Sequence, residues 1–164
     1  MDEESFHAFY EQTARNLRGY LRSMLNNQAI DRGLVDDLLQ ESYFRFLKAG
    51  LPDSTEPAHR KNYLYRIATN LVRDHRRARK VEELPEDSAD ATSADSLDTA
   101  HDVGRAFLKL KQREREVLWM AYVECFDHRE IAEVLRTKAV SIRPMLARAR
   151  ARFGDILRRR GIGA

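Results

Sequence analysis

The chain has 164 residues, with 29 Lys and Arg against 26 Asp and Glu, so its net charge is +3 at pH 7. The charge is uneven: residues 1–80 carry 14 basic and 11 acidic side chains, 81–100 carry none and 7, and 101–164 carry 15 and 8. Two basic segments joined by an acidic one favour an anionic polymer as partner. No apolar run approaches the roughly 18 residues of a membrane span, and the acidic N-terminus lacks signal-peptide features. We therefore expect a cytoplasmic protein without membrane insertion.

The hydrophobic pattern predicts an all-α fold. Apolar side chains recur at three- and four-residue steps in the N-terminal half, which predicts three helices, at 3–25, 34–49 and 60–79. Gly33 is expected to separate the first two helices, and Gly50 to end the second. Within the second helix, Phe46 and Leu47 are expected to face the core.

An acidic segment, 81–101, is predicted to be a flexible linker, because its small and charged side chains cannot bury enough apolar surface to offset the entropy of ordering. Helical periodicity then returns and predicts four more helices, at about 102–110, 112–124, 128–135 and 141–158. The sequence thus predicts two small helical domains, 1–80 and 102–160, on either side of the linker.

The last two predicted helices have the spacing of a helix-turn-helix. Asp127 can cap the helix 128–135, and Glu130 can bond back to it, as in a capping box. On the final helix a strip of small side chains lies between two rows of arginines: Pro144, Ala147 and Ala151, flanked by Arg143 and Arg150 on one side and by Arg148 and Arg152 on the other. This pattern is typical of a helix that enters a DNA groove, although arginines that only confer solubility are an alternative explanation.

A second basic helix is predicted at 60–79. Between 66 and 80 there are six basic residues and one acid, Asp74, and Tyr63 and Tyr65 lie near the start. Aromatic rings beside basic side chains suit single-stranded nucleic acid, because the rings stack on bases while the cations contact phosphates. The alternative is that both tyrosines belong to the helical core.

Nothing in the sequence indicates catalysis. The five histidines lack metal-ligand spacing, and there is neither a Gly-rich phosphate loop nor a serine in a nucleophile elbow. We therefore expect no catalytic residue, no metal and no cofactor. The single cysteine, Cys125, cannot form an internal disulfide and is expected to be a small core residue.

Four segments resemble bacterial RNA polymerase sigma factors of the extracytoplasmic-function group: 37–47, 62–77, 110–118 and 129–135. The resemblance covers nearly the whole chain. It implies a three-helix sigma-2 domain at 1–80 and a helix-turn-helix sigma-4 domain at 102–160. It also implies three partners, namely core RNA polymerase (through its clamp helices and flap), promoter DNA and an anti-sigma factor. The implied function is promoter recognition and opening without catalysis by the chain itself.

The resemblance also assigns roles by position. The residues that would contact core polymerase are Asp37, Gln40 and Glu41. Those that would bind the −10 promoter element are Tyr63, Tyr65, Arg66, Asn70, Arg73, Arg76 and Arg77. Those that would bind the −35 element are Ser141, Arg143, Ala147, Arg148, Arg150 and Arg152.

Two features depart from the family pattern. The helix-turn-helix turn usually reads Gly, an apolar residue and Ser, whereas here it reads Arg136, Thr137 and Lys138. Pro144 falls inside the expected recognition helix, where it removes a hydrogen bond unless Ser141 is the N-cap and the proline lies in the first turn. Recognition of the −35 element is therefore expected to be atypical. Two alternatives remain open: a decoy that sequesters an anti-sigma factor, and a stand-alone helix-turn-helix regulator.

Overall fold

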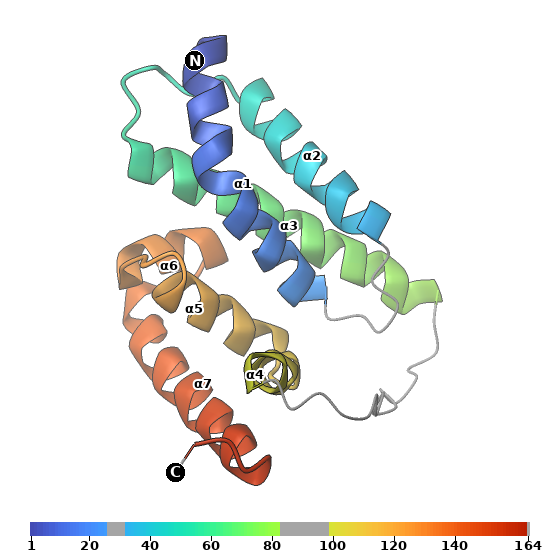
Figure 1. Cartoon of the computed structure of the whole chain (residues 1–164). Coiled ribbons are helices and arrows are strands. Elements are labelled where there is room, and N and C mark those ends of the chain that lie inside the picture. The colour runs from blue at the N-terminus through green and yellow to red at the C-terminus, as the bar shows by residue number, and fades with distance from the viewer. Residues whose placement is uncertain (26–31, 83–98, 164) are drawn as a thin grey trace.

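The computed structural model describes residues 1–25, 32–82 and 99–163, which form seven α-helices and no β-strand (Figure 1). The helices are α1 (Glu3–Leu25), α2 (Arg32–Lys48), α3 (Pro57–Glu82), α4 (Thr99–Leu108), α5 (Gln112–Tyr122), α6 (His128–Leu135) and α7 (Ala139–Arg159). The all-α prediction is confirmed, and all seven predicted helices lie within three residues of the observed bounds. None of the described helices is long and apolar enough to cross a bilayer.

The helix boundaries differ from the predictions in three places. Gly33 lies inside α2 rather than before it, whereas Gly50 follows α2 with φ 61°, as expected for a helix-terminating glycine. Pro57 begins α3, because a proline at the first helical position loses no helical hydrogen bond. Within the predicted linker, residues 83–98 lie outside the described part of the chain, while 81–82 and 99–101 belong to α3 and α4.

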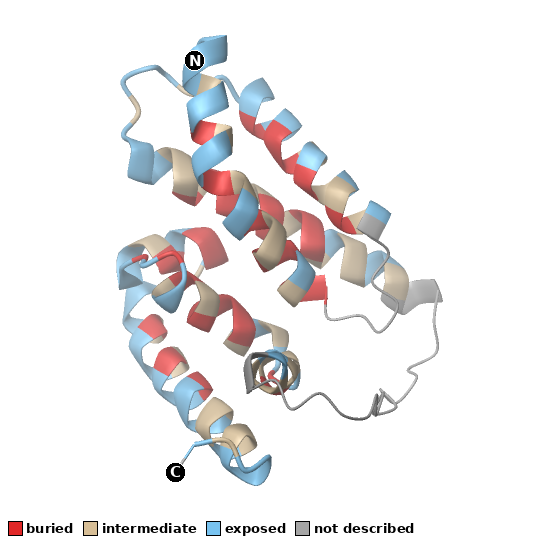
Figure 2. Cartoon of the chain, in the orientation of Figure 1, coloured by how far each residue is buried: buried red, intermediate tan, exposed pale blue. Residues whose placement is uncertain are grey.

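Helices α1, α2 and α3 pack together around a core of apolar side chains (Figures 1 and 2). Phe46 stacks on Phe9 with ring centroids 4.8 Å apart. Leu47, in contrast, is 46% exposed, so the prediction that it faces the core is wrong. One residue along a helix is a rotation of about 100°, and because Phe46 takes the inward position, Leu47 turns toward solvent.

Helices α4 to α7 form the C-terminal half, in which α7 packs against both α5 and α6. The predicted capping box is confirmed: the Glu130 N–H donates to Asp127 Oδ1 at 2.8 Å, and the Asp127 N–H donates to Glu130 Oε1 at 3.3 Å. Cys125 is exposed, which contradicts the prediction of a core residue. Its backbone is left-handed, with φ 56°, and this turn places Phe126 in the core instead.

The two halves of the chain are in direct contact, and one hydrophobic core runs through both. α3 packs against α6, and α1 packs against α5. A Cβ on Gly19 would lie 2.9 Å from Cη2 of Trp119, so only glycine allows the indole to approach this closely. Arg115 of α5 is buried in the same region and donates to the carbonyl of Met24 at the end of α1.

Three buried tyrosines predict a loss of stability at alkaline pH. Burial raises the pKa of Tyr20 and Tyr65 well above the ordinary value, with further contributions from the Glu116 and Glu124 carboxylates respectively, and raises the pKa of Tyr43 to about 12. In the unfolded chain all three ionise near pH 10. Above that pH the folded state binds more protons, so the stability that is fully present below pH 10 is lost as the pH rises toward 12.

Each of these tyrosines shifts the unfolding equilibrium by about tenfold per pH unit in that window. Arg115 and Arg76 act in the opposite direction, because burial and then the charge of Arg76 lower the pKa of Arg115 to about 10, and burial lowers the pKa of Arg76. The three tyrosines outnumber the two arginines, so the net effect is a loss. Urea midpoints measured between pH 9 and pH 11, with tyrosinate absorbance recorded in parallel, test the prediction. A midpoint that stays constant over this range would contradict it.

Candidate nucleic-acid interface

The turn between α6 and α7 has the shape of a helix-turn-helix turn although it contains no glycine. Arg136 ends α6 with φ 54°, in the left-handed region where glycine is the usual residue. The Thr137 N–H donates to the Ala132 carbonyl at 3.0 Å and closes the end of the helix. A non-glycine residue in this conformation costs roughly 1 to 2 kcal/mol, which the surrounding packing offsets. The departure from the family sequence thus leaves the turn itself intact.

Ser141 does not cap the last helix. Lys138 is the N-cap, with extended angles of φ −82° and ψ 140°, and α7 begins at Ala139. Ser141 therefore lies in the first turn, where its N–H donates to the Lys138 carbonyl at 2.9 Å. Pro144 is the sixth helical residue and is exposed, so the helical hydrogen bond to the Val140 carbonyl is missing within α7. The later helix start, which would have placed the proline in the first turn, is thereby ruled out.

The exposed face of α7 brings together most of the side chains predicted to bind the −35 element. Ile142, Leu146 and Ala149 are buried on the opposite side. The exposed set consists of Arg143, Pro144, Ala147, Arg148, Arg150, Ala151 and Arg152. Two of these arginines have partners within the chain: Arg150 Nη1 donates to Tyr122 Oη at 2.9 Å, and Arg152 Nε lies 3.4 Å from Glu114 Oε1.

The predicted −10 residues of α3 are divided between solvent and the interior. Arg77 is exposed, and Tyr63, Arg66 and Asn70 are half-buried. Tyr65 is fully buried, with its ring centroid 5.1 Å from that of Tyr20 and 5.6 Å from that of Phe126. In this arrangement Tyr65 cannot reach a base.

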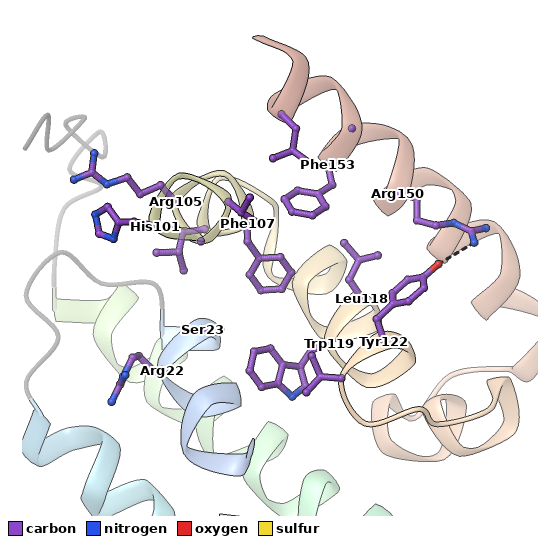
Figure 3. A pocket seen from close by; sticks show the side chains of 16 residues that line it. Arg22, Ser23, His101, Arg105, Phe107, Leu118, Trp119, Tyr122, Arg150 and Phe153 are labelled. Atoms are coloured by element: carbon purple, nitrogen blue, oxygen red, sulfur yellow. Dashed lines mark hydrogen bonds between the residues drawn. The ribbon is translucent and has the colours of Figure 1, made fainter. Parts of the chain in front are cut away.

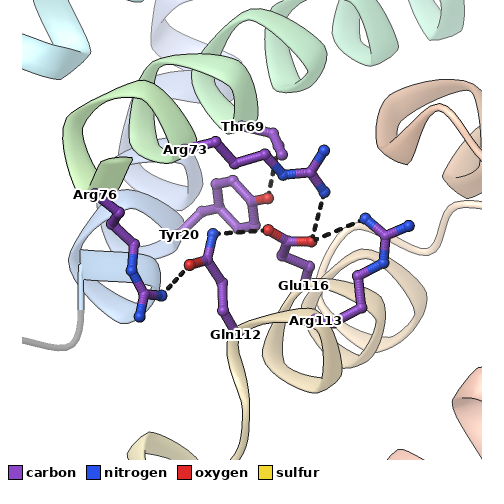
Figure 4. Close-up of polar contacts among 7 residues, drawn as sticks. All are labelled: Tyr20, Thr69, Arg73, Arg76, Gln112, Arg113 and Glu116. Atoms are coloured by element: carbon purple, nitrogen blue, oxygen red, sulfur yellow. Dashed lines mark hydrogen bonds and ion pairs between the residues drawn. The ribbon is translucent and has the colours of Figure 1, made fainter. Parts of the chain in front are cut away.

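Arg73 and Arg76 point toward the C-terminal half of the chain (Figure 4). Arg73 Nη2 lies 3.0 Å from Oε2 of Glu116, and Arg76 donates to the side-chain oxygen of Gln112. Both partners belong to α5. A further pair joins Lys61 Nζ to Glu124 Oε2 at 2.6 Å, and the Tyr65 hydroxyl donates to the other oxygen of Glu124.

A second exposed face lies on α2. Asp37 and Gln40 are exposed, and Glu41 forms an ion pair with Arg45 at 2.7 Å. Phe44 is 60% exposed on the same face, seven residues after Asp37, and is not among the residues predicted to contact the polymerase. The exposure of Phe44 could have been predicted from the sequence, because positions i and i+7 share a helix face. An aromatic side chain on the face of Asp37 points away from the core.

An apolar groove of about 1010 Å³ lies between α4, α5 and α7, with the end of α1 at its rim (Figure 3). Its apolar lining includes Phe107, Leu118, Trp119 and Phe153, and the Arg150–Tyr122 hydrogen bond lies beside it. The charged side chains that line it, Arg22, Arg105 and Arg150, are all basic.

Comparisons with known proteins show which family the chain resembles. The chain matches the family Sigma-70 region 2 over residues 9–81 and the family Sigma-70, region 4 over residues 100–153. RNA polymerase sigma factor SigZ of Bacillus subtilis (strain 168) is 25% identical over 154 residues, which are 90% of this chain and 84% of that protein.

Two solved structures have a similar fold. In the complex of the sigma factor RpoE with the anti-sigma factor NepR from Bartonella quintana, the similarity covers 94% of this chain and 98% of the other, with a TM-score of 0.72 and 18% identity. In the complex of CnrH with the cytosolic domain of CnrY, it covers 95% and 89%, with a TM-score of 0.67 and 23% identity. Because both sigma-70 regions are present in order and together span most of its length, the chain belongs to the sigma-70 family of sigma factors, in the extracytoplasmic-function group.

Proposed function

We propose that this sigma factor recruits core RNA polymerase and directs promoter recognition and opening, with residues 1–80 as sigma-2 and 102–160 as sigma-4. The observation that carries the proposal is the exposed arginine face of α7, which follows a capped α6 at helix-turn-helix spacing. Such a helix fits the major groove, where arginines contact phosphates and guanine edges. In this proposal α7 contacts the −35 element and α3 contacts the −10 element.

Promoter opening requires surfaces for unpaired bases as well as for duplex DNA. Unstacking costs a few kcal/mol per base, and aromatic and cationic side chains offset this cost by stacking on extruded bases and contacting phosphates. Tyr63, Asn70 and the arginines of α3 supply groups of these kinds. The chain itself performs no chemical step, since polymerisation belongs to the polymerase, and its place of action is the cytoplasm.

Two surfaces suit protein partners. The α2 face with Asp37, Gln40, Glu41 and Phe44 is the proposed contact for the clamp helices of the polymerase. The apolar groove between α4, α5 and α7 is the proposed contact for the polymerase flap. The two similar structures are complexes of RpoE with the anti-sigma factor NepR and of CnrH with the cytosolic domain of CnrY, and we extend an anti-sigma partner to this chain on that basis.

The decoy alternative is less well supported, because binding an anti-sigma factor alone does not require an exposed arginine face on α7. A stand-alone regulator would have no use for the basic α3 beside the helix-turn-helix. The test is to mix the purified chain with bacterial core RNA polymerase, followed by gel filtration and run-off transcription on fragmented genomic DNA. Co-elution with discrete transcripts is expected. Absence of co-elution would contradict the proposal and favour one of the two alternatives.

The proposed polymerase contact on α2 predicts a strong effect of Phe44→Ala. A large aromatic side chain at the centre of an interface typically costs 2 kcal/mol or more when truncated, which corresponds to about thirtyfold weaker binding to core polymerase. Because Phe44 is 60% exposed, the free protein is expected to keep its stability. Fluorescence anisotropy with labelled sigma factor measures the affinity. Val140→Ala, which truncates a residue that is 81% exposed on α7, is the control and is expected to change little.

A further inference from the structure

Two walls of the apolar groove are helix faces, and a glycine interrupts each of them. On α4, Gly104 lies between His101 and Leu108, and on α7, Gly154 lies between Arg150 and Leu157. All six residues line the groove, and on each helix their offsets of three and four residues place them on one face. The glycines therefore stand where larger side chains would narrow the groove.

The space beside both glycines is open. A Cβ on Gly104 would meet no atom beyond its own stretch of helix within 4 Å, and a Cβ on Gly154 would meet only the end of the Arg158 side chain, at 3.5 Å. Glycine is among the poorest residues for a helix interior, because it loses the most backbone freedom on folding. No close packing requires either glycine, and their effect is to keep the groove open.

The interior of the groove is apolar and aromatic. Phe107 of α4 and Phe153 of α7 meet edge to face, with ring centroids 5.9 Å apart, and Leu118 and Trp119 of α5 lie beside them (Figure 3). Sites for small organic ligands have volumes of roughly 300 to 1000 Å³, apolar linings and a few polar groups that fix orientation. At about 1010 Å³, the groove has the size and the lining of such a site.

The charged side chains at the groove select the sign of a ligand. Arg22 of α1 and His101 and Arg105 of α4 lie at one end, and Arg150 lies at the other (Figure 3). None of the described residues that line the groove is an Asp or a Glu. Arginines make strong, charge-assisted hydrogen bonds to carboxylates. The α1–α4 end, with two arginines from different helices, therefore suits an anionic headgroup and disfavours a cation.

We propose that the groove binds a free single-chain amphiphile with an anionic headgroup, of the class of a fatty-acid carboxylate. The carboxylate lies at the α1–α4 end with Arg22 and Arg105, and the alkyl chain passes over Phe107 and Trp119 toward Phe153. A bilayer presents headgroups rather than free chains, so the occupant is a single molecule and not a membrane. The same groove is the proposed contact for the polymerase flap, so the amphiphile excludes the flap. This consequence, unlike the binding itself, rests on the proposed function.

Three compounds with one alkyl chain test the headgroup: decanoate, decanol and decyltrimethylammonium. Each is titrated into the full chain below its critical micelle concentration. The emission of Trp119, the single tryptophan, reports binding in the groove, and calorimetry gives the affinity independently. Decanoate is expected to bind about tenfold more tightly than decanol, the gain from one charge-assisted hydrogen bond, and decyltrimethylammonium most weakly. Octanoate is expected to bind more weakly than decanoate by about fourfold for each missing methylene.

Two variants close the groove from opposite walls. Gly154→Leu and Gly104→Leu each place a side chain in the open space beside the glycine. The affinity for decanoate is expected to fall by about tenfold or more, since the leucine takes the volume of several methylenes of the ligand. Leucine also favours a helix more than glycine does, so the thermal midpoint is expected to stay the same or rise. Ala8→Leu adds the same side chain at an exposed position of α1 and is the control.

A charge variant tests the headgroup end. Arg22→Gln with Arg105→Gln is expected to bring the affinity for decanoate close to the affinity for decanol. Lys48→Gln with Arg129→Gln removes two exposed charges elsewhere and is the matched control, which is expected to keep the preference for decanoate. The affinity of labelled sigma factor for core polymerase is then measured with and without saturating decanoate. Decanoate is expected to weaken it.

The outcomes separate the ligand site from the role of the groove in polymerase binding. Decanol that binds as tightly as decanoate, binding that survives both glycine variants, or an equal loss in the two charge variants would overturn the proposal. Cosedimentation with phosphatidylglycerol vesicles that Gly154→Leu abolishes would overturn it in favour of a membrane surface. If decanoate does not bind, the ligand site fails and the flap contact is unaffected. If decanoate binds in the groove without weakening polymerase binding, the ligand site is confirmed and the flap contact is wrong.

Discussion

Replacing Arg115 by methionine is expected to lower the free energy of unfolding by about 3 kcal/mol. The guanidinium of Arg115 donates to the carbonyls of Leu110 and, at 3.4 Å, of Leu108 and Met24. Met24 and Leu108 lie at the C-terminal ends of α1 and α4, where the last carbonyls lack helical partners and the helix dipole favours a cation. Methionine fills similar space but leaves these buried acceptors unpaired, at roughly 1 to 3 kcal/mol for each well-formed bond lost.

The variant no longer has to bury a charge, which offsets part of this loss of stability. Two of the three hydrogen bonds are also long. The expected loss in free energy of unfolding is therefore well below the summed cost of three well-formed hydrogen bonds. Urea unfolding at pH 7, followed by circular dichroism, measures the change. Arg113→Met is the control. Arg113 is about half exposed, and its ion pair with Glu116 is long, at 4.0 Å, and worth about a few tenths of a kcal/mol. Equal losses in the two variants would show that Arg115 has no special role.

The helices could be predicted because their signals are local. Apolar spacing located α1 and α6 to the residue, and the Asp127–Glu130 capping box was found from its three-residue offset alone. The first residue of a helix was harder to predict where two residues could each act as the N-cap. Ser141 is the better N-cap by type, yet Lys138 takes the extended conformation and α7 begins earlier.

The contact between the two halves could not be predicted, because its principal residues are charged. Arg115 and Glu116 lie in a run of alternating basic and acidic residues, a composition typical of an exposed helix face, yet both are only 1% exposed. Their burial depends on partners about 90 residues away for Arg115 and about 40 for Glu116, at Met24 and Arg73. No local pattern encodes a pairing at that distance.

The same limit applies to the roles assigned to α3. The resemblance placed Tyr65, Arg73 and Arg76 on one functional surface, and the structure does bring them to one side of α3. What the residues alone could not indicate is that this side faces the α5 segment rather than solvent.

The strongest effect on DNA binding is expected from the arginines of α7. Replacing both Arg143 and Arg148 by alanine should weaken binding to a duplex promoter fragment by about thirtyfold near physiological salt, assuming about 1 kcal/mol for each phosphate contact. The slope of log affinity against log salt should also become shallower by about 2, because each lost phosphate contact removes roughly 0.9 from it. Anisotropy titrations over a range of salt concentrations, using a fragment identified by run-off transcription, measure both quantities.

Two matched double variants make the result specific to the recognition face. Arg159→Ala with Arg160→Ala removes the same charge at the far end of α7 and should change the slope much less if phosphates contact only the recognition face. Arg150→Ala with Arg152→Ala should have an intermediate effect, because these two side chains already bind Tyr122 and Glu114 and must give up those partners to reach DNA. If all three variants reduce affinity equally, the arginines act only through net charge. In that case α7 does not enter the groove, and −35 recognition through this helix is wrong.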